Sequence, residues 1–282
     1  MLEKLLSELP TVTEAHKRGS SSYNTLYNEL KDYVDNHYSY SGGEDTAISF
    51  GDIALTLPFF EMGNCNTTNL FDLDEIILFS FYHNNRDRYS SAVDIGANLG
   101  LHSIFMDKCG FSVDCYEPDE FHYSELLANL ELNACSNVNP IMAAVSDSTG
   151  EASFIRILNN TTSSHLKGSK DNVYGPTEEF NVVTIDINKA VEDADLVKID
   201  AEGHENTILE AISSDQFDHL DMVLEVSSPE SAQIIFDRFA SNCNILSQKL
   251  NWGAIRSVED IPVSYKEGSL FISRRFDSFY GN

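Results

Sequence analysis

A strand, a glycine turn and a helix start follow one another in residues 91–100, SAVDIGANLG, and this order constrains the fold more than any other part of the chain. Val93 and Ile95 are β-branched residues that favour a strand. Gly96 and Gly100 bracket a small polar turn, and an apolar pattern at helical spacing begins directly after it. The segment therefore predicts a strand that turns sharply into a helix.

From this segment to the end of the chain, short apolar strands alternate with amphipathic helices, which is typical of a parallel α/β sheet. The helical spacing is clear in residues 120–133, where Tyr123, Leu126 and Leu130 recur on one face. The expected strands are FSVDCYEP, NVNPIMAAVS, EASFIRI, NVVTIDI, DLVKID and DMVLEV. The closing segments CNILSQKL and GSLFISRRF are expected to form an antiparallel pair at the edge of the sheet.

The chain before this pattern carries no motif of its own, so we predict two parts: a cap of residues 1–90 that shapes the substrate site, and an α/β domain of residues 91–282. Two helical stretches are expected in the first 45 residues, and the β-rich AISFGDIALTLPFF follows them. A helix is then expected in FDLDEIILFSFYH, because Asp72 and Asp74 are favourable at a helix N-terminus.

Residues 158–180 are polar and long for a loop. Such loops are functional lids or disordered segments, and both interpretations stay open.

Charge and composition narrow the range of partners. The formal net charge is −27, which would repel phosphate backbones, so nucleic acid is not an expected partner. No apolar run approaches the ~18 residues of a membrane span, and the chain does not start like a signal peptide, so we expect a cytoplasmic protein and no membrane partner. The five cysteines are scattered and never spaced as C-x-x-C, which indicates neither a disulfide framework nor a zinc site. A homo-oligomer stays open.

The glycine turn predicts a ligand site at the carboxyl end of the first strand, where open α/β sheets bind ligands. Gly96 and Gly100 would let the backbone approach a ligand closely, and the helix from Leu101 would point free N–H groups toward it. About 20 residues further on, Glu117 in YEPD stands at the end of the second strand, where an acidic side chain accepts hydrogen bonds from a ribose diol. The pair of features indicates a nucleoside.

The absence of two glycines from the dinucleotide-binding pattern indicates which kind of nucleoside the site would bind. Asn98 and Leu101 occupy the second and third glycine positions of the dinucleotide pattern G-x-G-x-x-G, and the second glycine is the one that admits a pyrophosphate. Asp94 would repel a pyrophosphate but could bind a ligand's ammonium group through the turn. A nucleoside without phosphates, such as S-adenosylmethionine, is therefore favoured, and a nicotinamide dehydrogenase is disfavoured.

Taken in order, VDIGANLG, YEPD, AAVSDSTGEASF, TIDI, DLVKIDAEGHE and VLEV resemble the FkbM family of S-adenosylmethionine-dependent methyltransferases over roughly residues 48–226. The resemblance implies a class I methyltransferase fold: a Rossmann-like, doubly wound, mostly parallel seven-stranded sheet whose last strand is antiparallel. It also implies O-methylation of a sugar, polyketide or other small metabolite. The cofactor positions it implies are Asp94, Gly96, Asn98, Gly100 and Glu117, and we expect Asp147 at the adenine edge. His204 departs from the small residue often found there.

An acidic group is expected on the acceptor side of the site. Asp200 and Glu202, in DLVKIDAEGHE, stand at the carboxyl end of a strand that the fold places beside the cofactor's methyl group, and Glu225 ends the next strand. A neutral hydroxyl is a weak nucleophile, so either a carboxylate acts as general base or the acids hold a divalent cation. We predict no metal ligands. Alternatively, Lys198 neutralises these acids in a buried network.

The histidines offer another source of a base. His204 stands beside the carboxylates, and His165 lies in the long loop, so both are candidates. We list Asp200, Glu202 and His204 as the catalytic residues. The predicted function is methyl transfer from S-adenosylmethionine to an oxygen of a small-molecule or saccharide acceptor. A catalytically inactive nucleoside-binding or interaction module with the same fold is the alternative.

Overall fold

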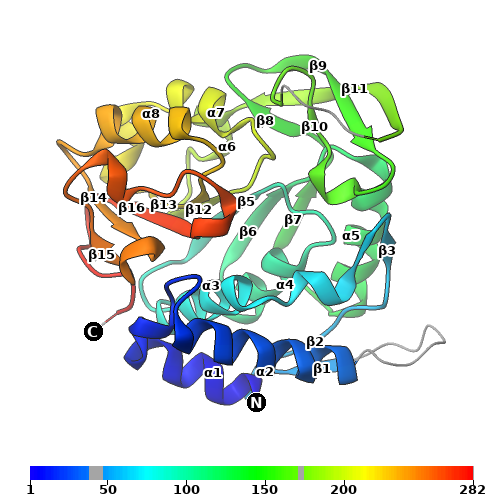
Figure 1. Ribbon diagram of the computed structural model, residues 1–282. Helices are drawn as coiled ribbons and strands as arrows, with labels where there is room; N and C mark the ends of the chain where they lie inside the picture. The colour runs from blue at the N-terminus through cyan, green and yellow to red at the C-terminus, as the bar shows by residue number, and fades with distance from the viewer. Residues whose placement is uncertain (38–46, 171–174, 282) are drawn as a thin grey trace.

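The computed structural model describes residues 1–37, 47–170 and 175–281. Its centre is a mixed sheet in which β13, β12, β5, β6 and β7 run parallel and β16 runs antiparallel to both of its neighbours (Figure 1). The eight strands, in spatial order, are β15 (Gly253–Ala254), β14 (Asn244–Ser247), β16 (Ser269–Ser273), β13 (Asp221–Glu225), β12 (Leu196–Ile199), β5 (Ser91–Ile95), β6 (Ser112–Tyr116) and β7 (Val138–Ile141). The predicted mostly parallel α/β sheet is confirmed.

Two details of the sheet differ from the prediction. The sheet has eight strands instead of seven, because the two-residue β15 pairs with β14. The antiparallel pair at the end of the chain is present, but β16 does not lie at the edge: it is inserted between β13 and β14. All five residues of β16 are buried, so this strand needs partners on both sides.

Helices cover both faces of the sheet, and the alternation of side chains along a strand feeds two cores. Ala92 of β5 belongs to the core formed with the N-terminal helices α1 (Leu2–Glu8), α2 (Ser21–His37) and α3 (Leu73–Asn84) and with α4 and α5, whereas its neighbour Val93 belongs to the core formed with α6–α8. In Figure 1, α6–α8 lie above the sheet and α1–α4 lie below it. The helices of the α/β part are α4 (Leu101–Lys108), α5 (Glu120–Leu132), α6 (Ile187–Ala190), α7 (Glu205–Ala211) and α8 (Pro229–Phe239). The doubly wound arrangement is confirmed.

A second, four-stranded sheet stands beside the carboxyl ends of the main strands. It has the order β10–β9–β11–β8, with β8 (Ala144–Ser146), β9 (Gly150–Ile157), β10 (His165–Leu166) and β11 (Thr177–Asp186). The segment NVNPIMAAVS, predicted as one strand, divides into β7 of the main sheet and β8 of this one, because the chain turns sharply where Ala143 N donates to Ile141 O at 2.9 Å.

The N-terminal part packs directly on the main sheet. Its elements are α1 (Leu2–Glu8), α2 (Ser21–His37), the hairpin β1 (Ala47–Ser49) and β2 (Ala54–Thr56), the short pair β3 (Glu61–Met62) and β4 (Cys65–Asn66), and α3 (Leu73–Asn84). As expected, Asp72 caps α3, accepting from Asp74 N and Glu75 N. The Phe79 ring stacks on Phe105 of α4 at 4.5 Å, so this part shares one core with the sheet.

Two further expectations concern disulfide bonds and membrane-spanning helices. All five cysteines are free, and Cys109 and Cys115 are buried. Over the ranges that the structure describes, no helix is both long and apolar enough to cross a membrane.

Candidate active site

The turn between β5 and α4 has the shape that the sequence predicts. Gly96, Asn98 and Gly100 have positive φ angles of 80°, 53° and 86°, a conformation that favours glycine and tolerates asparagine. Gly96 N and Ala97 N both donate to Tyr116 O at 3.0 Å, which ties the turn to β6. The chain therefore leaves β5 through a rigid loop at the carboxyl end of the sheet.

The close approach that these glycines allow is made by the protein's own chain. A Cβ atom on Gly96 would lie 1.9 Å from the carbonyl oxygen of Asp200, and one on Gly100 would lie 2.4 Å from Leu126 of α5. Gly96 thus lets β5 and the end of β12 come together. Gly100 serves the packing of α4 against α5.

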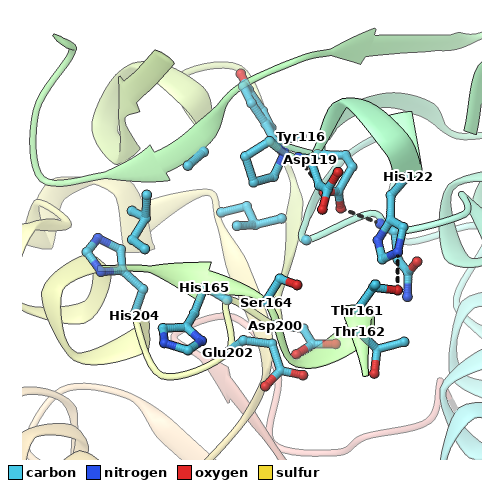
Figure 2. Close-up of a pocket in the computed structure, with 18 of the residues that line it drawn as sticks. Tyr116, Asp119, His122, Thr161, Thr162, Ser164, His165, Asp200, Glu202 and His204 are labelled. Carbon is cyan, nitrogen blue, oxygen red and sulfur yellow. Dashed lines mark hydrogen bonds between the residues drawn. The ribbon is translucent and has the colours of Figure 1, made fainter. Parts of the chain in front are cut away.

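A cavity of about 420 Å³ opens where this turn meets the ends of β6 and β12, the second sheet and α3. Six of the nine residues predicted as catalytic or cofactor-binding line it, namely Gly96, Asn98, Glu117, Asp200, Glu202 and His204, and the further candidates His165 and Glu225 line it as well. Figure 2 shows Asp200, Glu202 and His204 with Tyr116, Asp119 and the loop residues Thr161, Thr162, Ser164 and His165 around this space. The sequence therefore identified both ends of one cavity.

Three predicted cofactor residues do not line this cavity. Gly100 packs against α5, as described above. Asp94 is fully buried: its carboxylate accepts from Ser103 Oγ at 2.6 Å and lies 3.3 Å from Lys198 Nζ. Asp147, which follows β8, accepts from the hydroxyls of Ser146 and Ser148. Because Lys198 holds the Asp94 carboxylate outside the cavity lining, a contact of Asp94 with a ligand ammonium through the turn stays a prediction.

Lys198 adopts the arrangement in which it neutralises the acids of β5 and β12. Its ammonium lies 3.6 Å from Asp200 in addition to the contact with Asp94. Burial opposes the charged form of Lys198, but Asp94 and Asp200 together raise the pKa of the ammonium. Asp200 reaches the cavity from this pair and stays partly exposed.

Glu117 holds the far side of the turn. It is 5% exposed, and its carboxylate accepts from Asn98 N at 2.9 Å and from Asp119 N at 2.8 Å. Burial raises the pKa of Glu117 to about 8, against these two hydrogen bonds. Each carboxylate oxygen keeps a further lone pair for a ligand hydroxyl.

Replacing Glu117 with alanine is expected to weaken S-adenosylmethionine binding about 10- to 100-fold, since two hydrogen bonds between the ribose and the Glu117 carboxyl group are lost. Equilibrium dialysis with labelled S-adenosylmethionine measures this loss. Glu120→Ala is the matched control, because Glu120 is an exposed acid on the same segment that does not line the cavity. Equal affinities for Glu117→Ala and the control would remove Glu117 from the ligand site.

The opposite end of the cavity is acidic. Glu202 forms an ion pair with Lys170 of the long loop, and Glu225 extends from the end of β13. Burial and the neighbouring Asp200 raise the pKa of Glu202 to about 7, and the same two causes raise the pKa of Glu225 well above its ordinary value. Several carboxyl groups therefore share this end, and they do not all carry a charge at neutral pH.

His204 is fully engaged by the protein. Its Nε2 lies 2.9 Å from Ser146 Oγ and its Nδ1 lies 3.0 Å from Ser169 Oγ. Burial lowers the pKa of His204, so the ring is neutral at physiological pH. Both nitrogens have a hydroxyl partner, and the ring joins β8 to the long loop.

Sequence reasoning missed Glu75, which reaches the cavity from α3. Its Oε2 lies 2.6 Å from Nε2 of His102, whose Nδ1 lies 3.1 Å from the hydroxyl of Tyr82. Glu75 also lines a smaller adjoining cavity of about 120 Å³, together with Arg18 and Lys198. The sequence signals only a helix start here, and no local pattern shows that α3 would turn this acid toward β12.

The long loop forms one wall of the cavity. Its described part contains the turn Thr161–Ser163 and β10, and Thr161 Oγ1 lies 2.8 Å from His122 Nε2 (Figure 2). Arg156 of β9 binds both carboxylate oxygens of Asp119 and stabilises the same corner. The predicted loop also includes residues 171–174, which lie outside the described residues.

The sequence left open whether the acidic residues hold a divalent cation. Within residues 1–37, 47–170 and 175–281, no group of three or more His, Cys, Asp or Glu side chains is arranged to hold a metal ion.

Together the sheet order, the antiparallel β16 and the glycine turn beside Glu117 define a class I methyltransferase fold, which binds S-adenosylmethionine as the methyl donor. The cavity fits this cofactor: its lining is acidic at the end opposite Glu117, and S-adenosylmethionine carries a positive sulfonium and an ammonium. The family model described as Methyltransferase FkbM domain matches residues 94–244, more than half of the 282 residues. The chain belongs to the FkbM methyltransferase family.

Solved structures of other methyltransferases are similar to this one. A SAM-dependent methyltransferase from Agrobacterium tumefaciens is 11% identical, with a TM-score of 0.44 over 83% of this chain and 70% of that one. An rRNA methylase from Streptococcus thermophilus is 9% identical, with a TM-score of 0.38 over 70% and 93%. A ribosomal protein L11 methylase from Lactobacillus delbrueckii is 16% identical, with a TM-score of 0.35 over 69% and 77%. A comparison with curated proteins gives no match.

Proposed function

We propose that this protein transfers the methyl group of S-adenosylmethionine to a hydroxyl oxygen of a small acceptor without negative charge, such as a saccharide or another polyol. One observation carries the proposal. Among the described residues, the cavity lining holds six carboxyl side chains and no lysine or arginine; the six are Glu75, Glu117, Asp119, Asp200, Glu202 and Glu225.

Charge explains why this lining selects the acceptor. A phosphate or carboxylate on the acceptor, about 4 Å from Asp200, would be opposed by roughly 4 kcal/mol at the effective dielectric of a protein surface. Lys198 and Lys170 pair with Asp200 and Glu202 and offset part of this repulsion, but within the described residues no lysine or arginine lines the cavity to contact the anion itself. A hydroxyl group, in contrast, donates hydrogen bonds to carboxylates without such a penalty.

Different residues of the cavity bind the cofactor and the acceptor. Gly96 and Asn98 form the turn that receives the methionine part of the cofactor, and Glu117 accepts from its ribose. Asp200 and Glu202 accept hydrogen bonds from the acceptor and orient it. Bound S-adenosylmethionine supplies an activated methyl group, so the protein's contribution is to align the acceptor oxygen and to exclude water.

The N-terminal part of the chain shapes the acceptor end. Glu75 of α3 lines both cavities, and Tyr265 adjoins it there. We therefore propose that residues 1–90 act as the substrate-shaping part of the enzyme, with Glu75 as the acid that it contributes.

An acceptor panel with labelled methyl donor tests the proposal. The panel contains uncharged polyols and methyl glycosides, each paired with its phosphorylated and its carboxylated counterpart. We expect methylation of uncharged members at least 10-fold faster, in kcat/KM, than of their anionic counterparts, which corresponds to about 1.4 kcal/mol or more. The product is expected to be an ether that is stable in alkali. An alkali-labile ester, a methylated amine, or a preference for the anionic members would contradict the proposal.

The alternative, an inactive nucleoside-binding module, gives a different result in the same experiment. Such a module would bind S-adenosylmethionine and methylate no member of the panel. Its favoured partner would then be another macromolecule instead of a small acceptor.

A further inference from the structure

One side chain of the cavity has an unused hydrogen-bonding position. His165 of β10 is 1% exposed and lines the cavity. Its Nδ1 lies 2.9 Å from the carbonyl oxygen of Ser163. A carbonyl only accepts, so Nδ1 carries the proton, and Nε2 of the neutral ring is left with its lone pair.

This lone pair has no partner within the protein. Across the described residues, Nε2 of His165 is buried and makes no hydrogen bond. Leaving a buried acceptor unsatisfied costs about 1–3 kcal/mol, and such exceptions are concentrated at functional sites. The protein thus holds one imidazole in a single tautomer, with its basic nitrogen free.

Three other basic groups at this end of the cavity already have partners. His204 has a serine hydroxyl on each ring nitrogen, Asp200 is paired with Lys198, and Glu202 is paired with Lys170. Burial and Asp200 raise the pKa of Glu225 well above its ordinary value, which favours its protonated form. His165 remains as a neutral base, because burial lowers its pKa more than the hydrogen bond to Ser163 O raises it, and the Lys170 ammonium lowers it further.

The position of His165 suits an acceptor bound by the acidic group. Figure 2 shows its ring among the side chains at this end of the cavity, with Ser164, Glu202 and Asp200. The neighbouring Ser164 accepts a hydrogen bond from Ile157 N–H on its Oγ at 3.1 Å, which fixes the loop on β9. The loop therefore presents His165 from a fixed backbone.

We propose that His165 is the catalytic base of the methyl transfer, an inference that rests on the proposed function. Its Nε2 accepts the hydrogen bond of the acceptor hydroxyl and takes the proton as the oxygen forms its bond to the methyl carbon. The bond between that carbon and the donor's sulfur breaks, the sulfonium becomes a neutral thioether, and the positive charge passes to the imidazolium. Ser163 O stabilises this charge through Nδ1–H, and the ring returns the proton to solvent.

His165→Asn is the most informative variant. The asparagine amide can still donate to Ser163 O, as Nδ1 does, but it carries no base at the position of Nε2. With the fastest uncharged acceptor of the panel, we expect kcat to fall at least 100-fold while S-adenosylmethionine affinity and thermal unfolding stay close to those of the wild type. His219→Asn is the matched control, since His219 is exposed and does not line the cavity. His165→Ala with added imidazole, which is expected to regain activity, covers the case in which His165→Asn does not fold.

A nitrogen NMR measurement needs no turnover. In the wild-type protein labelled at histidine, Nε2 of His165 is expected to give the signal of an unprotonated ring nitrogen. That signal is expected to move when methyl α-glucoside is added with S-adenosylhomocysteine. A protonated Nε2, or a signal that the glucoside does not move, would overturn the role of His165.

The two proposals fail in different ways. If the wild type forms ethers and His165→Asn keeps more than about a third of the wild-type kcat, His165 is not the base and the proposed function stands. If the wild type methylates no hydroxyl, the proposed function fails, and the inference about His165 fails with it.

Discussion

Gly96→Ala is expected to lower the free energy of unfolding by about 2–5 kcal/mol and to abolish cofactor binding. The new Cβ would lie 1.9 Å from Asp200 O, and the φ angle of +80° disfavours any L side chain. Overpacking costs about 1–3 kcal/mol and a left-handed conformation about 1–2 kcal/mol. The contact is with backbone, which has no rotamer to give way, so β5 and β12 must separate.

Gly110→Ala separates the cost of overpacking from the cost of the left-handed backbone conformation. Gly110 has a φ of +97°, but nothing lies within 4 Å of a Cβ at this position. We therefore expect only the conformational cost of about 1–2 kcal/mol, with cofactor binding unchanged. Urea unfolding of both variants gives the comparison. Equal losses would mean that the close approach of β5 to Asp200 contributes nothing.

Lys198→Met is expected to cost about 3–5 kcal/mol of stability, because it leaves the fully buried Asp94 without its counter-charge. The hydrogen bond from Ser103 remains but does not neutralise the carboxylate. Methionine has a similar length, so the loss measures charge more than packing. Asp94→Asn combined with Lys198→Met removes both charges and is expected to recover a large part of the loss.

The pH dependence of this loss follows from Asp94. Burial alone would raise the pKa of Asp94, but the Lys198 ammonium lowers it below its ordinary value. A lowered carboxyl pKa contributes stability above the unfolded-state value, and this contribution disappears as the pH falls through the folded-state value. The difference between wild type and Lys198→Met is therefore expected to be largest near neutral pH and to shrink in acid. Urea unfolding at about pH 7 and about pH 4 would contradict this account if the two differences were equal.

Local patterns explain what the sequence could predict. The strand, turn and helix of residues 91–108 are encoded by neighbouring residues, and Glu117 follows at a spacing fixed by one helix and one strand. The approach of Asp200 to the glycine turn is implied by the resemblance to the FkbM family, whose fold places this strand beside the first one, and β12 does pair with β5 in parallel. These predictions depend on topology and not on the direction of a side chain.

Side-chain direction explains what the sequence could not predict. Asp94 precedes the glycine turn as a cofactor residue would, but its carboxylate points toward Lys198 and Ser103. Glu75 reaches the cavity only because α3 packs on α4 through long-range aromatic contacts such as Phe79 on Phe105. The free nitrogen of His165 depends on the conformation of one loop residue, Ser163, which no periodicity reveals.

Calorimetric titration with S-adenosylmethionine, S-adenosylhomocysteine and NAD in parallel tests the central claim most directly, that the cavity beside the Gly96 turn is a methyl-donor site. We expect micromolar binding of the first two and none of NAD, because the lining offers no cation to a pyrophosphate in the described residues. Loss of this binding in Glu117→Ala would place it in the cavity. Binding of NAD without binding of S-adenosylmethionine would contradict the account.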